Sequence, residues 1–198
     1  MINKGRVRII AVTDGDHVAQ RAVQAAGHAL GLRTISRSAG NPTLLSGQQI
    51  LALAKEAPWD PVIVMVDDHG DPRYGMGERA LEFLMESPEC DVVGVIAVAS
   101  DTPTAKGTAV HFSIDCGGAV VHWPVNKFGE VMHHSRLKGD TVDLLSYHAG
   151  PLVVGIGDIG KMHGCDSFGR GVPITTRAIA EILRRRKIQI RQRHPVHS

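Results

Sequence analysis

Apolar and polar positions follow one another along the chain in blocks that are typical of a sheet covered by helices. Short, nearly continuous apolar runs indicate strands buried on both faces at residues 7–12, 62–66, 91–99 and 152–156. Between and after them, small and apolar residues recur at helical spacing over 17–30, 46–57, 78–85 and 174–188. With a short strand at 34–36, this order predicts an α/β fold with a doubly wound, mostly parallel sheet flanked by helices.

The middle of the chain has a different pattern. Residues 112–115 and 120–123 alternate in polarity around Gly117-Gly118, which predicts a β-hairpin insertion near 110–132 that forms an antiparallel edge or an arm. A short strand over 126–132 and a short helix over 140–147 are also expected. The strand at 62–66 is expected to be central. We interpret residues 1–198 as one α/β domain with a basic tail at 184–198.

Charge is distributed unevenly. The last fifteen residues hold six of the 22 Lys and Arg residues and no acid, which leaves sixteen basic against twenty acidic residues in the body. This tail either contacts anionic lipid, nucleic acid or an acidic partner, or is a solvated helix end whose cations complement the helix dipole. No apolar run approaches the roughly 20 residues of a membrane span. The first eight residues lack a secretory signal pattern, so a protein made in the cytosol is expected.

Aspartates gather after two of the predicted strands. In an open α/β sheet ligands bind outside the carboxyl ends of the strands, and in common strand orders the first and third strands are neighbours. Oxygen ligands converging there would suit Ca²⁺ or Mg²⁺. The alternative is that these residues cap helices and form turns, as Asp16 and Asp14-Gly15 are placed to do. The candidate metal ligands are Asp14, Asp16, Asp67, Asp68, Asp71 and Glu78.

A loop of small and polar residues at 36–43 could bind a carboxylate or phosphate through hydroxyls, a guanidinium and backbone amides, or could be an ordinary connection. The glycine pattern at 155–160 matches a dinucleotide fingerprint in spacing only, since no helix follows directly. No Gly-x-Ser-x-Gly elbow is present, and nucleophilic catalysis is not supported. The candidate ligand-binding residues are Ser36, Arg37, Ser38, Asn41 and Lys161.

Six motifs together resemble the soluble stage V sporulation protein AE family. They are VTDGD (12–16), SRSAGNPT (36–43), DD (67–68), GERAL (77–81), IAVAS (96–100) and GDIGKM (157–162), and the likeness runs from about Arg6 to Leu183. The resemblance implies a non-enzymatic accessory protein of sporulation and spore germination, peripheral at the spore inner membrane. Its implied partners are the other stage V membrane-channel proteins that move dipicolinic acid with Ca²⁺, and dipicolinate itself.

A more distant likeness concerns the Toprim domain, the metal-binding α/β unit of topoisomerases and primases; the predicted sheet is Toprim-like or Rossmann-like. An acid after the first strand and acids after the third, followed by Gly77-Glu78-Arg79, are similar to that domain. The Toprim pattern usually has glutamate where Asp14 stands and Asp-x-Asp where Asp67-Asp68-His69 stands. With His69 in place of the second acid, two-metal phosphoryl chemistry is placed in doubt.

The sequence therefore leaves three alternative functions open. The first is the sporulation accessory protein, whose pocket would bind Ca²⁺, dipicolinate or both. The alternative is a Toprim-like, metal-dependent enzyme acting on nucleic acid or a phosphate ester, although a nucleic-acid partner is not favoured. The third is a homo-oligomer in which the hairpin at 112–123 contacts a second copy.

Overall fold

The computed structural model describes residues 5–70, 74–101, 106–139, 141–146 and 150–192. Seven strands form one mixed sheet, which is not closed, in the order β2-β4-β1-β5-β8-β6-β7. Every neighbouring pair is parallel except β6 with β7. The strands are β1 (Val7–Val12), β2 (Arg33–Thr34), β4 (Val62–Met65), β5 (Cys90–Val98), β6 (Phe112–Ile114), β7 (Val120–Val121) and β8 (Leu152–Ile156).

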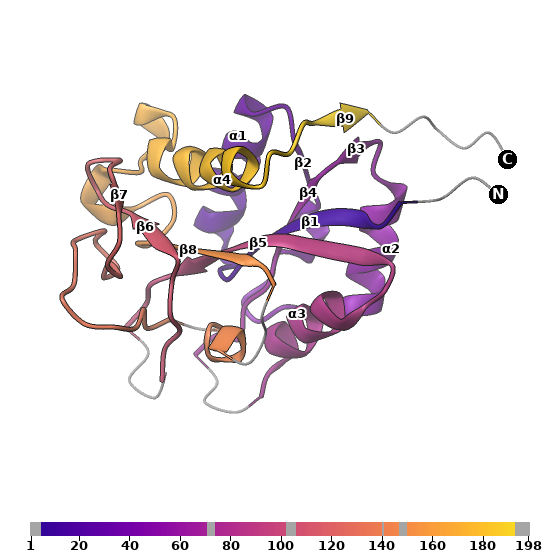
Figure 1. Cartoon of the computed structure of the whole chain (residues 1–198), viewed down its shortest axis with the longest axis horizontal. Helices are drawn as coiled ribbons and strands as arrows, with labels where there is room; N and C mark the ends of the chain where they lie inside the picture. Colours follow the sequence, from indigo (N-terminus) through magenta and orange to yellow (C-terminus); the bar gives the residue numbers. More distant parts are fainter. Residues whose placement is uncertain (1–4, 71–73, 102–105, 140, 147–149, 193–198) are drawn as a thin grey trace, which may run out of the picture.

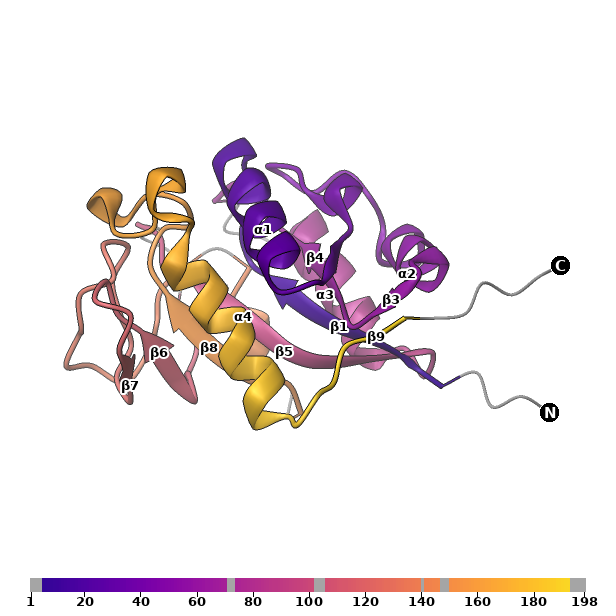
Figure 2. The ribbon, with the colours of Figure 1, turned by 90° about the horizontal axis from the view of Figure 1, so that it is seen from above.

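In the described part of the chain, four α-helices cover the two faces of this sheet, which confirms the predicted α/β fold. Figure 1 shows α1 (His17–Ala29) and α4 (Pro173–Arg185) on one face and α2 (Gly47–Glu56) and α3 (Met76–Glu86) on the other. Seen from above, α1 and α4 lie side by side (Figure 2). The carboxyl ends of parallel strands lie at the same side of a sheet, so the loops that follow these strands gather there.

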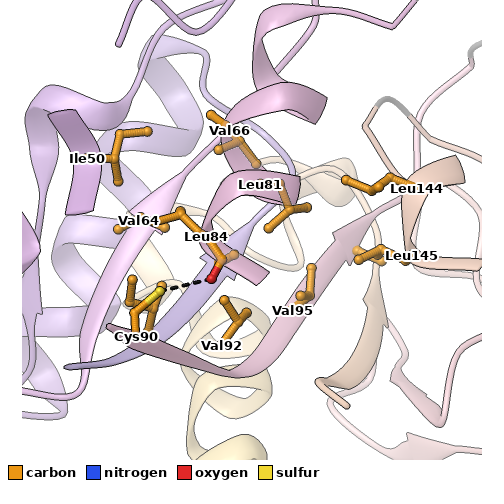
Figure 3. Close-up of a cluster of buried hydrophobic side chains, with 14 of the residues drawn as sticks. Ile50, Val64, Val66, Leu81, Leu84, Cys90, Val92, Val95, Leu144 and Leu145 are labelled. Atoms are coloured by element: carbon orange, nitrogen blue, oxygen red, sulfur yellow. Dashed lines mark hydrogen bonds between the residues drawn. The ribbon is translucent and has the colours of Figure 1, made fainter. Parts of the chain in front are cut away.

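The continuous apolar runs follow from having a core on each face. In β1, Ile9 and Ala11 pack in the cluster under α2 and α3, whereas Ile10 and Val12 pack in the cluster under α1 and α4. Successive strand side chains point to opposite faces, so a strand covered on both sides needs apolar residues throughout. Figure 3 shows the first cluster, in which the buried Cys90 thiol donates to the Leu84 carbonyl at 2.9 Å. Burial raises the pKa of this thiol.

Helix starts follow the expected capping chemistry. Asp16 accepts a hydrogen bond from the Ala19 amide at 2.7 Å and is the N-cap of α1. Ser46 and Gln49 exchange both bonds of a capping box at the start of α2, as predicted. None of the helices in the described ranges is long and apolar enough to cross a membrane.

The insertion extends the main sheet instead of leaving it. The predicted hairpin is confirmed as β6 and β7, and β6 pairs in parallel with β8, so β7 is an edge strand. The prediction of a strand over 126–132 is wrong, because an isolated bridge between Val125 and Val131 forms there instead. Between them the Asn126 side chain accepts hydrogen bonds from the Phe128 and Glu130 amides and closes a turn.

Four further expectations need correction. The strand at 62–66 is not central, since β4 lies second from the β2 edge. The helix expected over 140–147 is the short 3₁₀ helix η2 (Asp143–Ser146), and residues 140 and 147 lie outside the described residues. The last helix ends at Arg185, before Lys187 takes up a left-handed φ of 53°. Only the first residue of the strand expected at 34–36 is extended, and a 3₁₀ turn, η1 (Ser36–Ser38), follows.

One small element was not predicted. A two-stranded sheet pairs β3 (Trp59–Asp60) with β9 (Arg191–Gln192) in antiparallel fashion. Arg8 at the start of β1 reinforces this junction, since its Nε atom lies 2.5 Å from an Asp60 carboxylate oxygen. The end of the described chain is thus tied to the segment that leads into β4.

Candidate functional site

An acidic cleft of about 290 Å³ opens at the carboxyl end of the sheet. Its walls come from the loops that follow β1, β4, β5 and β8, together with one residue of the loop before α2 and one of the insertion. This is the edge at which ligands bind in open α/β sheets. The lining residues are Thr13, Asp14, Asp16, Asn41, Asp67, Val98, Ala99, Ser100, Asp101, Lys127, Asp158 and Lys161.

Asp14 is the carboxylate that this environment perturbs most clearly. One of its oxygens accepts a hydrogen bond from the Asp16 amide at 3.2 Å, which shapes the loop after β1. Burial raises its pKa to about 7, and the neighbouring charges of Asp16, Asp67 and Asp158 act in the same direction. Asp14 therefore exchanges a proton close to neutral pH. A carboxylate in a cleft whose pKa is raised this strongly is a candidate functional residue.

Lys161 connects two other carboxylates of the cleft. Its ammonium lies 3.0 Å from Asp16 and 3.1 Å from Asp158, and these two partners raise its pKa although burial acts against them. Burial would raise the pKa of Asp16, but the Ala19 amide and Lys161 outweigh it and hold that pKa below its ordinary value. The second lysine of the cleft, Lys127, pairs with Asp101. Both lysines thus already have acidic partners.

Asp67 locks the two loops of the cleft together. Its oxygens accept hydrogen bonds from the Gly15 amide at 3.1 Å and from the His69 amide at 2.9 Å. The Asp67 amide in turn donates to the Thr43 hydroxyl at 2.7 Å. Gly15 is needed here, because a Cβ atom would lie only 2.4 Å from the Gly40 carbonyl oxygen. Asp67 lines the cleft while fixing its shape.

Asp68 has a structural role at the start of α3. It is buried, and its carboxylate accepts hydrogen bonds from the Gly77 amide at 2.6 Å, the Glu78 amide at 3.0 Å and the Thr141 hydroxyl at 3.0 Å. These are donors at the first turn of α3, so Asp68 caps that helix from a distant loop. Glu78 lies beside it, and burial, followed by the charges of Asp68 and Asp143, raises its pKa to about 7.

The predicted metal ligands are therefore only partly brought together. Asp14, Asp16 and Asp67 share the cleft, Asp68 and Glu78 lie at the start of α3 outside its lining, and Asp71 lies outside the described residues. Across the ranges that the structure describes, no three His, Cys, Asp or Glu side chains could hold a metal ion. Those described residues do not fit a chelated Ca²⁺ or Mg²⁺, and the six-acid cation site stays a prediction.

The predicted ligand-binding residues divide in the same way. Asn41 and Lys161 line the cleft. Ser38 is buried, with its hydroxyl donating to the Ile35 carbonyl at 2.7 Å and accepting from the Met65 amide at 2.8 Å. Ser36 accepts from the Gln24 side chain at 2.5 Å, and Arg37 is exposed. The turn at 36–38 thus joins α1 to β4.

Sequence reasoning missed three cleft residues and one structural acid. Asp101 and Asp158 follow β5 and β8, so the strand-end rule that selected Asp14 would have found them. Lys127 carried no local signal. Asp166 is fully buried and accepts hydrogen bonds from Gly160 at 2.9 Å, from Ile174 at 2.8 Å and from the Thr175 amide and hydroxyl at 3.0 and 2.6 Å. It caps α4 from the loop before it.

The fold and the cleft define an open α/β protein with an acidic site at the carboxyl ends of its strands. A family model described as SpoVAE, Stage V sporulation protein AE1, matches residues 8–186, and the chain belongs to this family. It is a sporulation-associated protein. No curated protein and no solved structure matches the chain.

Proposed function

We propose that this family member is a non-enzymatic accessory protein of sporulation and spore germination that works beside the membrane machinery moving dipicolinic acid and Ca²⁺. Family membership over residues 8–186 supports the sporulation part. The observation that carries the molecular part is the acidic cleft, which offers a binding surface at the edge where α/β proteins hold ligands. Its partners are other stage V membrane-channel proteins, at the spore inner membrane.

The charge of the cleft selects the kind of group that enters it. Five aspartates face two lysines, and each lysine already pairs with an aspartate of the cleft. Such a surface attracts a positive group and repels a dianion such as free dipicolinate. The occupant is therefore a Ca²⁺ ion held through its water shell, alone or with dipicolinate, or a cationic side chain of a partner.

Calorimetry on the pure protein separates these occupants. We expect heat on titration with Ca²⁺ or with the Ca²⁺–dipicolinate chelate, and none with dipicolinate alone. Asp14→Asn combined with Asp158→Asn should remove the signal, while Glu82→Gln on α3, outside the cleft, should keep it. Heat from dipicolinate alone would contradict the charge argument, and silence from all three would leave a partner's side chain as the occupant.

A deletion strain tests the biological role. We expect slower germination or a lower dipicolinate content, restored by the parent gene and by Glu82→Gln but not by the double cleft variant. The proposal would be contradicted if the deletion strain showed normal germination and normal dipicolinate content under every nutrient tested.

One observation favours a second function. Asp14 and Asp67 share the cleft at the ends of neighbouring parallel strands, as the acids of a Toprim-like, metal-dependent enzyme would. Against it, Asp68 is occupied in capping α3, and both Asp67 oxygens accept backbone amides. Incubation with Mg²⁺ or Mn²⁺ and labelled RNA and DNA decides the matter, because cleavage that is lost in Asp14→Asn and Asp67→Asn would establish the enzyme.

A further inference from the structure

The exposed side of α4 carries a dense group of bases around one buried acid. Glu181 is almost fully buried, and its carboxylate lies 2.9 Å from Arg177, 2.7 Å from Arg184 and 3.3 Å from Arg185. The hydrogen bond from Arg184, together with the other arginines, holds the pKa of Glu181 below its ordinary value. One negative charge therefore orients three guanidinium groups on the surface.

Two more bases continue this group past the end of the helix. Arg186 donates to the Val93 carbonyl at 2.9 Å, and Lys187 is exposed. The five residues Arg177, Arg184, Arg185, Arg186 and Lys187 form what we call the α4 basic patch. Its excess of positive charge is four, because Glu181 is the single acid between residues 173 and 187.

Four of the five patch residues, 184–187, lie at the opposite end of the strands from the cleft, and Arg177 lies along the helix between the two ends. Helix α4 begins beside Gly160 and Asp166, near the cleft, and ends where Arg186 reaches Val93 near the start of β5. In Figure 2 the helix crosses the sheet between these two ends. The acidic cleft and the α4 basic patch therefore give the protein a polarity along the strand direction.

From this polarity we propose that the α4 basic patch docks the protein on an anionic phospholipid bilayer, with the acidic cleft facing away from the lipid. The inference rests on the proposed function, in which the protein works beside a membrane. An anionic leaflet attracts clusters of Lys and Arg near its surface, and it repels the acidic end of the molecule.

An apolar neighbour of the patch favours a bilayer over nucleic acid. Ile190 follows the patch with 39% of its surface exposed, and Ile188 is half-buried beside it. At the headgroup boundary both charge and apolar contact stabilise binding. The phosphate backbone of a nucleic acid offers partners to the arginines but none to an isoleucine.

Co-sedimentation with vesicles tests the proposal. We expect binding to vesicles made of phosphatidylglycerol and phosphatidylcholine in equal parts, none to pure phosphatidylcholine, and weaker binding as NaCl is raised. Arg184→Gln with Lys187→Gln should weaken binding by roughly tenfold or more. Glu181 keeps Arg177 and Arg185 in this variant, and a thermal melt checks that it is folded.

Two control variants make the result specific. Lys55→Gln with Arg79→Gln removes the same charge from the α2 and α3 side and should change binding less than about twofold. Arg184→Lys keeps the charge and should also bind within about twofold. Failure to bind the anionic vesicles, an equal loss in the control on α2 and α3, or preferential binding of duplex DNA would overturn the proposal. Failure here would leave the germination phenotype, and so the proposed function, untouched.

Discussion

Two groups of aspartates lie near the carboxyl end of the same sheet and do different work. Asp68 and Asp166 are buried, and each accepts hydrogen bonds from backbone amides and from a threonine hydroxyl. Asp14 lines an open cleft, among other acids, with a pKa of about 7. The number of hydrogen-bond donors around each carboxylate therefore distinguishes the aspartates that hold the fold together from the one that faces the cleft.

The largest expected effect is at Asp166. Its replacement by alanine leaves three backbone amides and the Thr175 hydroxyl without their acceptor at the buried start of α4. We expect the free energy of unfolding to fall by about 3–5 kcal/mol, measured by chemical denaturation. Asp101→Ala, at a mostly exposed cleft residue, should cost less than about 0.5 kcal/mol. Similar losses in the two variants would show that the buried and the exposed aspartate contribute equally to stability.

Asp68→Ala should rank second. It removes the acceptor of two amides of α3 and of the Thr141 hydroxyl, for an expected loss of about 2–3 kcal/mol. Losing the Asp68 charge should also lower the pKa of Glu78, which NMR titration can follow. An unchanged Glu78 titration would show that the Asp68 charge does not contribute to its raised pKa.

Asp14 should make stability depend on pH in the opposite sense from an ordinary surface acid. Its pKa is about 7 in the folded protein and near 3.8 when unfolded, so the folded state binds the extra proton between these values. Stability is therefore fully present below about pH 4 and is lost as the pH rises through 7. The stability advantage of Asp14→Asn over the parent should therefore grow with pH, by up to about 3 kcal/mol between pH 4.5 and pH 8.

Denaturation of both proteins at several pH values provides the measurement. Glu78, with a pKa of about 7, adds a second contribution of the same sign, which Glu78→Gln isolates. A parent-to-variant difference that does not grow with pH would show that Asp14 is ionised in the folded protein well below neutrality.

The smallest effect is expected at Lys161. Lys161→Met removes two partly exposed ion pairs, so stability should change by less than about 1 kcal/mol. The cleft loses a positive charge, and the pKa of Asp14 should rise further, as seen by NMR. A fall in that pKa would mean that Asp16 and Asp158 move apart when the lysine is absent.

The main strands and helices could be predicted because their signals are local. A strand such as β1, packed between two cores, must be apolar at successive positions. The capping box formed by Ser46 and Gln49 indicates the start of α2 within four residues of sequence. The pairing of β3 with β9 joins residues about 130 positions apart through two-residue strands, and so short a strand has no periodicity to detect.

The location of the site could be predicted, but the different roles of its aspartates could not. The rule that ligands bind beyond strand ends located Asp14 and Asp67 correctly at one edge. Whether an aspartate caps a helix across the fold depends on how distant segments meet, as Asp68 does with Gly77 and Thr141. The same holds for Lys127, which an insertion brings back to the cleft.

The β3 and β9 pair has a practical consequence. It holds Arg191–Gln192 next to Trp59–Asp60, at the end of the molecule where β1 begins at Val7. The acidic cleft opens at the other end of the strands. A surface linker or fluorescent reporter attached beside Val7 or Gln192 should therefore leave the cleft unobstructed, so immobilised protein can be used to isolate molecules that enter the cleft.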